Sequence, residues 1–437
     1  MKNKFLQIYM ILFTGLMLLT SSCKMDMVNP NAATDADALT TRAGIIALSI
    51  GLRQFYSTSG LTSYIVYSGV TSREIKGVST GTTTVELEAG GSSISTNNTA
   101  VLSYWSNMQH IMSMSESIID NAPNVSTIES DMLSGIMAQA YLFKAISLAE
   151  LVSAFEQSNI QTSTTEKVTF YSREQVLAEA IRLLNLGIAQ ITTTAPSSTF
   201  TSTVTGADFD LKNTLYAYAA RYNLMAGNYQ AATDNANLVD LTKTSKFVYN
   251  TLTINPLYTV FSVTQSYKAR ANFGLPSGLY DADDKRLSFY FTGTSTLVNT
   301  DPVITLAGFS AQTSSIPVYM PDELKLIRAE ATLRNNGSLT DALALINDVR
   351  TQTSGDLFGV NAGLPAYSGS VTKDDLLLEV YKQRCAELYL SGLKWEDTRR
   401  FGRPVPPADV TERNRVFYPY PDQERQNNPN TPADPAI

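Results

Sequence analysis

The sequence predicts a mainly α fold, in which helix pairs form a scaffold that carries long loop-rich insertions and a few short strands. Two observations predict it. Apolar residues recur every three or four positions over many segments, as on the buried face of a helix, and three other segments rich in Ser, Thr, Gly and Asn lack this period. The 437 residues are 43% hydrophobic and 17% charged, which predicts a large core and excludes a charge-rich disordered chain.

The amino terminus has the pattern of an export signal over residues 1–22. Lys2 and Lys4 provide the positive start, and residues 8–19 form an apolar stretch too short for a membrane span. Small residues then lead into Cys23, as in the lipobox of a bacterial lipoprotein. We expect Cys23 to be the lipidated first residue of a mature chain that folds as one domain to residue 437. The alternative is ordinary cleavage that leaves Cys23 as a thiol.

The helices follow in order from their periods and capping residues. Ser126 and Glu129 have the spacing of a capping box, which predicts a helix with one apolar stripe from there to about Gln157. Ser172 with Gln175 predicts the same start for the next helix. Further helices are expected at these ranges: 43–57, 101–120, 209–226, 229–243, 321–335, 339–352 and 373–391.

The segments without a helical period are 74–100, 191–206 and 244–315. We expect loops with short hairpins in them. The insertions near 74–100 and 244–315 are long for a compact domain, and loops of this length are usually functional or flexible.

Two of the helix pairs share a turn. Gly227 begins the run Gly-Asn-Tyr-Gln-Ala-Ala, and Gly337 begins the looser copy Gly-Ser-Leu-Thr-Asp-Ala. This is the pattern of a tetratricopeptide hairpin, in which glycine permits the reversal and alanine allows close helix approach. The copies lie 110 residues apart instead of roughly 34, so we expect the insertions to interrupt the pairs. The alternative is two unrelated hairpins with similar turn chemistry.

Charge and reactive residues exclude several classes of function. The net charge is −7 without a basic block, which argues against nucleic-acid binding. His110 is the single histidine, so His-based catalysis and His-cluster metal binding are disfavoured. Cys385 lies on an apolar helical stripe and should be buried and inert, and it cannot form an internal disulfide if Cys23 is lipidated. We assign no catalytic residue, cofactor or metal ligand.

Three ordered blocks mark the last third of the chain. Residues 317–331 contain Leu-Ile-Arg-Ala-Glu-Ala, residues 383–402 contain Arg-Cys-Ala-Glu-Leu and Gly-Leu-Lys-Trp-Glu-Asp-Thr-Arg-Arg, and residues 418–430 contain Tyr-Pro-Tyr-Pro-Asp-Gln-Glu and Asn-Pro-Asn. With the lipobox, they resemble the SusD/RagB outer-membrane lipoproteins of Bacteroidota. One departure is Lys394, where the family usually has Arg. The residues that match the family's structural motif are Arg384, Glu387, Gly392, Trp395, Asp397 and Arg400.

Four of these motif residues form two candidate ion pairs. Arg384/Glu387 and Asp397/Arg400 have the i, i+3 spacing of neighbours on one helix face. A glycosidase would use Glu387 and Asp397 as acid and base or nucleophile. A general acid needs a raised pKa, however, whereas neighbouring arginines keep carboxylates ionised. We therefore favour structural ion pairs, expect Trp395 in the core, and predict that the chain is not an enzyme.

The family resemblance implies a binding function at the cell surface. Such a lipoprotein is anchored in the outer membrane through its cysteine and faces the cell exterior. It captures an oligosaccharide, or in some members a peptide, and passes it to a TonB-dependent, SusC-like transporter. The alternative is an exported hydrolase that acts on glycans at the cell surface.

Ligand contacts are expected on the insertions, as the resemblance implies. The segment 74–100 contains no Phe, Tyr or Trp, so aromatic rings that stack on sugars must come from 244–315. Tyr267 and Tyr280 lie beside Ser, Lys, Gly and Asp, and we predict them as the ligand contacts. The alternative is that they pack under a loop.

Overall fold

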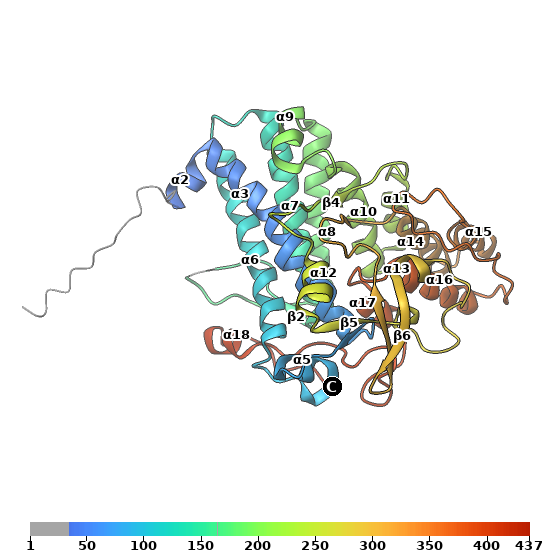
Figure 1. Ribbon diagram of the computed structural model, residues 1–437. Coiled ribbons are helices and arrows are strands. Elements are labelled where there is room, and N and C mark those ends of the chain that lie inside the picture. The colour runs from blue at the N-terminus through green and yellow to red at the C-terminus, as the bar shows by residue number, and fades with distance from the viewer. Residues whose placement is uncertain (1–34, 164) are drawn as a thin grey trace, which may run out of the picture.

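A computed structural model describes residues 35–163 and 165–437 (Figure 1). Residues 1–22 and Cys23 lie outside the described residues. The fold is mainly helical, which confirms the predicted fold class. The longer helices are α3 (Arg42–Phe55), α6 (Thr99–Asn121), α7 (Ser130–Ala154), α8 (Arg173–Thr193), α10 (Leu211–Met225), α11 (Tyr229–Asn237), α14 (Pro321–Arg334), α15 (Leu339–Arg350) and α16 (Lys373–Glu387).

Shorter elements complete the described chain. The short helices are α2 (Asp35–Thr40), α4 (Ser68–Thr71), α5 (Thr82–Ala89), α9 (Ser198–Phe200), α12 (Pro256–Tyr258), α13 (Arg286–Tyr290), α17 (Lys394–Arg400) and α18 (Asp422–Asn427). The strands are β1 (Ile75–Gly77), β2 (Gln157–Ser158), β3 (Tyr171–Ser172), β4 (Lys246–Phe247), β5 (Tyr267–Arg270), β6 (Phe291–Val298), β7 (Asp301–Leu306) and β8 (Ile316–Pro317).

Helix α7 is the central helix of the scaffold, packed between α3, α6, α8 and α10. Twenty of its 25 residues are buried, so the prediction of a single apolar stripe was wrong. The expected capping box at Ser126 and Glu129 was also wrong, because the helix begins at Ser130 and no side chain caps it. The box at Ser172 and Gln175 is formed and opens α8.

Among the described residues, α7 is also the one helix long and apolar enough to cross a membrane by length and composition. Of its apolar window, 83% is buried inside the protein. The position of α7 among four other helices accounts for this hydropathy, since a helix that is apolar all round belongs in a core.

The two predicted helix pairs are α10–α11 and α14–α15, and α11 packs on α14. Gly227 has φ +79°, and in the second turn this left-handed position belongs to Asn336, with φ +54°. The expected equivalence of Gly227 and Gly337 is therefore off by one residue. Asparagine is one of the few residues with a side chain that tolerate this conformation. Ala232 and Ala342 are fully buried, as close helix approach requires.

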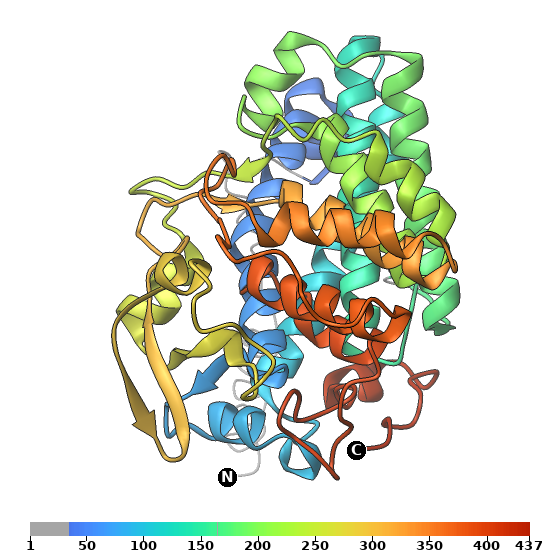
Figure 2. The same cartoon turned by 90° about the vertical axis from the view of Figure 1, so that its right-hand side faces the viewer.

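The two insertions meet in one four-stranded sheet of order β1-β5-β7-β6. Strand β1 of the first insertion pairs antiparallel with β5 of the second, with Ile75 opposite Ala269, and β6 and β7 form a hairpin. Figure 2 shows this sheet and α5 on one side of the molecule and the helices α11, α14 and α15 on the other. Helix α5 was missed from the sequence because it buries only Thr84 and Leu87 and so has little apolar period.

Buried ion pairs hold α14, α16 and α17 together. Asp397 accepts from Arg384 Nε at 2.8 Å and from Arg400 Nη2 at 2.8 Å, and Arg400 Nε also donates to Glu330 Oε1 at 2.7 Å. The i, i+3 pair of Asp397 and Arg400 is thus present. Burial alone would raise the pKa of Glu330, but the charge of Arg400 lowers it below its usual value.

The other expected pair, Arg384 with Glu387, is not formed. Glu387 Oε2 instead accepts from Arg286 Nη1 at 3.1 Å, and Arg286 Nη2 also donates to Asp284 at 2.6 Å. The spacing of three residues was correct for a helix, but the two side chains bond to different neighbouring helices. Arg384 pairs with Asp397 of α17, and Glu387 pairs with Arg286 of α13. Helical spacing alone does not choose between a partner on the same helix and a better placed partner across a packed interface.

The loop before α17 explains the rest of the motif. Gly392 has φ +82°, and an added Cβ would lie 2.6 Å from the Tyr64 ring. Trp395 is 1% exposed and its Nε1 donates to the Arg415 carbonyl at 2.8 Å, so it packs in the core. Lys394 Nζ donates to the carbonyls of residues 273 and 274 at 3.2 and 3.0 Å. These bonds connect the motif to the second insertion through backbone oxygens rather than through a carboxylate.

Candidate ligand-binding site

A groove on the insertion sheet, here called the sheet groove, is bounded by β5, β6, β7 and the preceding helical turn η6 (Thr259–Thr264). Its volume is about 430 Å³, within the range of small-ligand sites. The lining residues are Phe261, Ser262, Gln265, Tyr267, Lys268, Ala269, Thr294, Thr296, Val303, Ile304, Thr305 and Leu306.

Local sequence explains how the sheet groove forms. Thr294 and Thr296 of β6 both line the groove, at the point where the β6–β7 register shifts between Thr292 and Thr296. Gln265 has φ +50°, a left-handed residue that ends η6 and turns the chain into β5. Residues of η6 and of the β6–β7 hairpin therefore line the groove together with those of β5.

Of the two predicted ligand contacts, Tyr267 lies in the sheet groove and Tyr280 does not. Tyr267 is half-buried, and burial raises the pKa of its hydroxyl, which a hydrogen bond with Thr84 of α5 partly offsets. Tyr280 is also half-buried, but it precedes the Asp281–Arg350 ion pair and lines none of the described cavities reported below. The structure thus separates the two tyrosines.

The lining of the sheet groove suits neutral polar ligands. Phe261 and Tyr267 offer ring faces, while the threonines, Ser262 and Gln265 offer hydroxyl and amide groups that can bond to sugar hydroxyls. Lys268 is the one basic residue, and no Asp or Glu is among the described lining residues. An acid–base pair for glycoside hydrolysis is therefore lacking from this lining.

A second cavity, of about 550 Å³, lies beside β1 and carries most of the local charge. Glu88 Oε1 accepts from Lys76 at 2.9 Å, Arg73 at 3.1 Å and Arg270 at 2.6 Å, while Asp301 Oδ2 lies 2.6 Å from Lys76. Burial would raise the pKa of Asp301, but hydrogen bonds and charge from Lys76 and Arg270 lower it. These carboxylates are ion-paired, which is the wrong state for a general acid.

A third cavity, of about 580 Å³, lies between α6, the loop before β3 and α18. Gln109 and Asn159 exchange two amide hydrogen bonds there, of 2.7 and 3.0 Å, and Trp105 lines the cavity beside them. Sequence reasoning missed this cavity because three distant segments contribute its residues. The one local signal was the Tyr-Trp pair at the start of α6.

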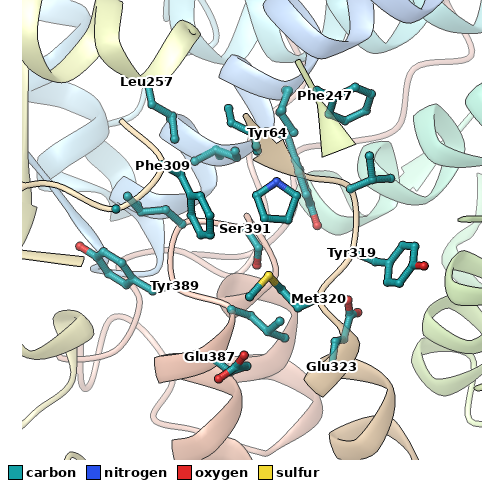
Figure 3. Close-up of a pocket in the computed structure, with 18 of the residues that line it drawn as sticks. Tyr64, Phe247, Leu257, Phe309, Tyr319, Met320, Glu323, Glu387, Tyr389 and Ser391 are labelled. Carbon is teal, nitrogen blue, oxygen red and sulfur yellow. The ribbon is translucent and has the colours of Figure 1, made fainter. Parts of the chain in front are cut away.

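The cavity in Figure 3 holds only about 50 Å³, which is room for water but not for a sugar. The carboxylates of Glu387 and Glu323 lie at its lower edge in this view. Burial raises the pKa of Glu387 well above its usual value, and Arg286 only partly offsets this. An arginine partner is thus present, but it is Arg286 rather than Arg384, and Glu387 has no access to a sugar-sized site.

Cys385 is likewise unsuited to chemistry. Its side chain is 2% exposed in α16, and burial raises the pKa of the thiol to about 12. The thiolate required of a nucleophile is therefore negligible at neutral pH.

Comparisons with known proteins agree with the motifs and the fold. The SusD family model matches residues 307–433. A search of the curated proteins finds no match.

Several solved structures are similar over most of the chain. A SusD-like carbohydrate binding protein from Bacteroides fragilis has a TM-score of 0.69 at 14% identity, over 90% of this chain and 99% of that one. A SusD superfamily protein from Bacteroides thetaiotaomicron has a TM-score of 0.68 at 15% identity, over 90% and 100%. For a putative sugar binding protein from Bacteroides vulgatus the TM-score is 0.64 at 15% identity, over 91% and 99%.

These structural matches cover about nine tenths of the chain, and the family model covers all three ordered blocks of the last third. The resemblance inferred from the sequence is thereby confirmed: residues 307–433 match the SusD family model, and the chain has the fold of the solved SusD-like structures.

Proposed function

We propose that this protein binds an oligosaccharide at the cell surface and passes it to a TonB-dependent, SusC-like transporter. The observation that carries the proposal is the sheet groove, where rings, hydroxyls and amides line a cavity of about 430 Å³ without a carboxylate. Solved proteins of the same fold that are described as carbohydrate or sugar binding support it. A peptide ligand is the second outcome that the binding test distinguishes.

The test of the site uses two tyrosine variants in the same insertion. Purified chain lacking residues 1–23 is titrated calorimetrically with pooled oligosaccharides and, separately, with pooled peptides. We expect Tyr267→Ala to weaken binding by about tenfold, since a stacked ring contributes about 1 kcal/mol or more. Tyr280→Ala is the matched control, because it removes an equally half-buried ring that lies outside the sheet groove. Weakening by Tyr280→Ala alone would move the site to that loop.

The alternative, a glycan hydrolase, predicts turnover. Incubation of the same oligosaccharides with the chain at stoichiometric and catalytic concentrations, followed by product analysis, separates the two functions. Binding alone leaves the oligosaccharides intact, whereas sustained release of shorter sugars at catalytic concentration would reject the proposal.

Delivery to a transporter requires an anchor and a docking face. We propose acylation at Cys23, with the chain on the outer face of the outer membrane. Several acyl chains would hold it stably, which a single chain does not. A Cys23→Ser variant should move to the soluble fraction, and its continued membrane retention with incorporated fatty acid would contradict the lipobox interpretation.

The rigid helix pairs α10–α11 and α14–α15 are the proposed docking face. A preformed face loses little conformational entropy on association, and the insertion sheet then faces an enclosed ligand chamber. The protein's net charge of −7 favours a relatively basic transporter surface and an association that weakens with salt. Pull-down from solubilised outer membrane in low salt, with glycan present, should recover a large β-barrel protein. Repeated recovery of none would favour a free-standing binding protein.

A further inference from the structure

Three carboxylates from separate elements converge at one point of the scaffold. Asp322 lies in the first turn of α14, Glu387 is the last residue of α16, and Asp356 belongs to the loop between α15 and α16. One oxygen from each lies within 4.8 Å of the other two. Oxygens that share a calcium ion at 2.3–2.6 Å are separated by at most about this distance.

The immediate surroundings do not neutralise this cluster. Lys325 Nζ lies 2.7 Å from Asp322 Oδ1, and Arg286 is shared between Glu387 and Asp284. Counting Asp284, four carboxyl groups face two cations, so the cluster has a formal charge of −2 when all four are ionised. Asp322 and Glu387 are 2% and 1% exposed, so water screens little of this charge.

A second observation points to a missing ligand rather than to mutual repulsion alone. Glu387 Oε1 is fully buried and has no hydrogen-bond partner, although its other oxygen is bonded to Arg286. Asp356 Oδ1 accepts from the N–H groups of Phe358 and Val360, both at 2.8 Å, which orients the carboxylate. An unpaired buried carboxylate oxygen is costly, and a cation at the centre of the cluster would satisfy it.

We propose that Asp322, Asp356 and Glu387 bind one divalent cation of the Ca²⁺ type. Two uncompensated charges match a divalent ion, and an all-oxygen set without His or Cys selects a hard cation. The half-exposed Asp356, next to the exposed Gly355 and Leu357, provides the entrance and room for water ligands. The bound ion joins the start of α14, the end of α16 and the loop that separates α15 from α16.

Without the ion, the cluster destabilises the fold. Asp322 and Glu387 are buried, and one oxygen of each lies within 4.8 Å of an oxygen of Asp356, so the three carboxylates repel one another. Removing one charge by Asp356→Asn therefore has opposite effects in the two states. It relieves repulsion in the apo protein, and it removes a ligand from the loaded protein while keeping the Oδ1 acceptor of the loop.

Two measurements on the purified chain lacking residues 1–23 test the site: calorimetric titration with Ca²⁺ alone, and Tb³⁺ luminescence. Tyr290, whose hydroxyl donates to the Glu387 carbonyl at 2.9 Å, is placed to sensitise bound Tb³⁺. We expect Tyr-sensitised Tb³⁺ emission that decreases when Ca²⁺ displaces the Tb³⁺ ion. The Tm should be higher in about 5 mM Ca²⁺ than in EGTA, because this concentration exceeds the ~10⁻⁴–10⁻³ M dissociation constants of extracellular calcium modules. Asp356→Asn should weaken Ca²⁺ binding at least about tenfold and abolish the rise.

The control is Asp374→Asn, an exposed acid at the other end of α16. It should keep the wild-type Ca²⁺ affinity, emission and Tm rise. In EGTA, Asp356→Asn should melt at or above the wild-type temperature, which a merely structural role of this carboxylate would not produce. The proposal is wrong if neither Ca²⁺ nor Tb³⁺ binds, or if Asp356→Asn retains wild-type affinity.

Discussion

The C-terminal ion pairs and the second insertion reverse the usual distribution of residue classes, because the first buries charges and the second exposes leucines. In the scaffold, Arg384 and Asp397 are both 2% exposed and bonded to each other. In the insertion, Leu252 is 95% exposed and Leu297 is 71% exposed. The scaffold therefore contains buried ion pairs, whereas the insertion leaves some apolar side chains in water. We therefore expect stability and ligand contact to respond to different substitutions.

The largest expected effect is on the scaffold. Asp397→Ala leaves Arg384 and Arg400 buried without this partner, which should lower the free energy of unfolding by about 3–5 kcal/mol. Arg182→Ala, which breaks the exposed pair with Glu179, should cost at most about 1 kcal/mol. Denaturant titration of both variants measures the difference. Equal costs would mean that burial of the ion pairs is irrelevant to the scaffold.

The pH dependence of stability should report on Glu150, a buried scaffold carboxylate without an arginine or lysine partner among the described residues. Glu150 of α7 accepts from the Tyr56 hydroxyl at 2.6 Å, its Oε2 has no partner, and burial raises its pKa from 4.5 to about 8. Between these values the folded protein holds a proton that the unfolded chain has released, so stability falls as pH rises.

We expect Glu150 to contribute a loss of about 1.4 kcal/mol per pH unit across this window. In Glu150→Gln, unfolding curves at pH 5 and 8 should lack this contribution, whereas the exposed control Glu156→Gln should behave as wild type. An unchanged slope in Glu150→Gln would show that the buried glutamate is ionised throughout.

Substitutions at the left-handed residue of each hairpin turn should change the free energy of unfolding by different amounts. Gly227→Val places a β-branched residue at φ +79° and should cost about 1–2 kcal/mol, although an added Cβ would meet nothing closer than 3.9 Å. Asn336→Gly should be neutral or slightly stabilising, because glycine accepts φ +54° without strain. Thermal unfolding of both variants measures the contrast, and a destabilising Asn336→Gly would imply a role for the asparagine side chain.

The smallest effect is expected in the insertion. Leu297→Thr on the exposed edge of β6 should change the free energy of unfolding by less than about 0.5 kcal/mol. Val303→Ala, at 1% exposure in the neighbouring β7, should cost about 2 kcal/mol. If Leu297→Thr destabilises as much as Val303→Ala, the exposed residues belong to the packing of the fold rather than to a free surface.

Local patterns in the sequence determined most of the scaffold. The 3.6-residue period, the capping box at Ser172 and the Gly-Asn-Tyr turn each depend on residues within one turn of one another, so they could be recognised without tertiary structure. The same is true of the ordered motifs that led to the family. Lipidation of Cys23 is also a local prediction, and it concerns residues outside those that the structure describes.

Only the tertiary structure decided which segments meet. Glu387 pairs with Arg286, about a hundred positions away in the sequence, because helix packing places the Arg286 guanidinium closer to Glu387 than that of Arg384. Strand β1 pairs with β5 although Ile75 and Ala269 lie 194 positions apart. The pairing of β5 with β7, together with β6 and η6, forms the sheet groove, which contains Tyr267 but not Tyr280. The convergence of Asp322, Asp356 and Glu387 had no sequence signal either. Contacts of this kind depend on burial and on the relative positions of whole elements, and these are properties of the packed chain rather than of any local pattern.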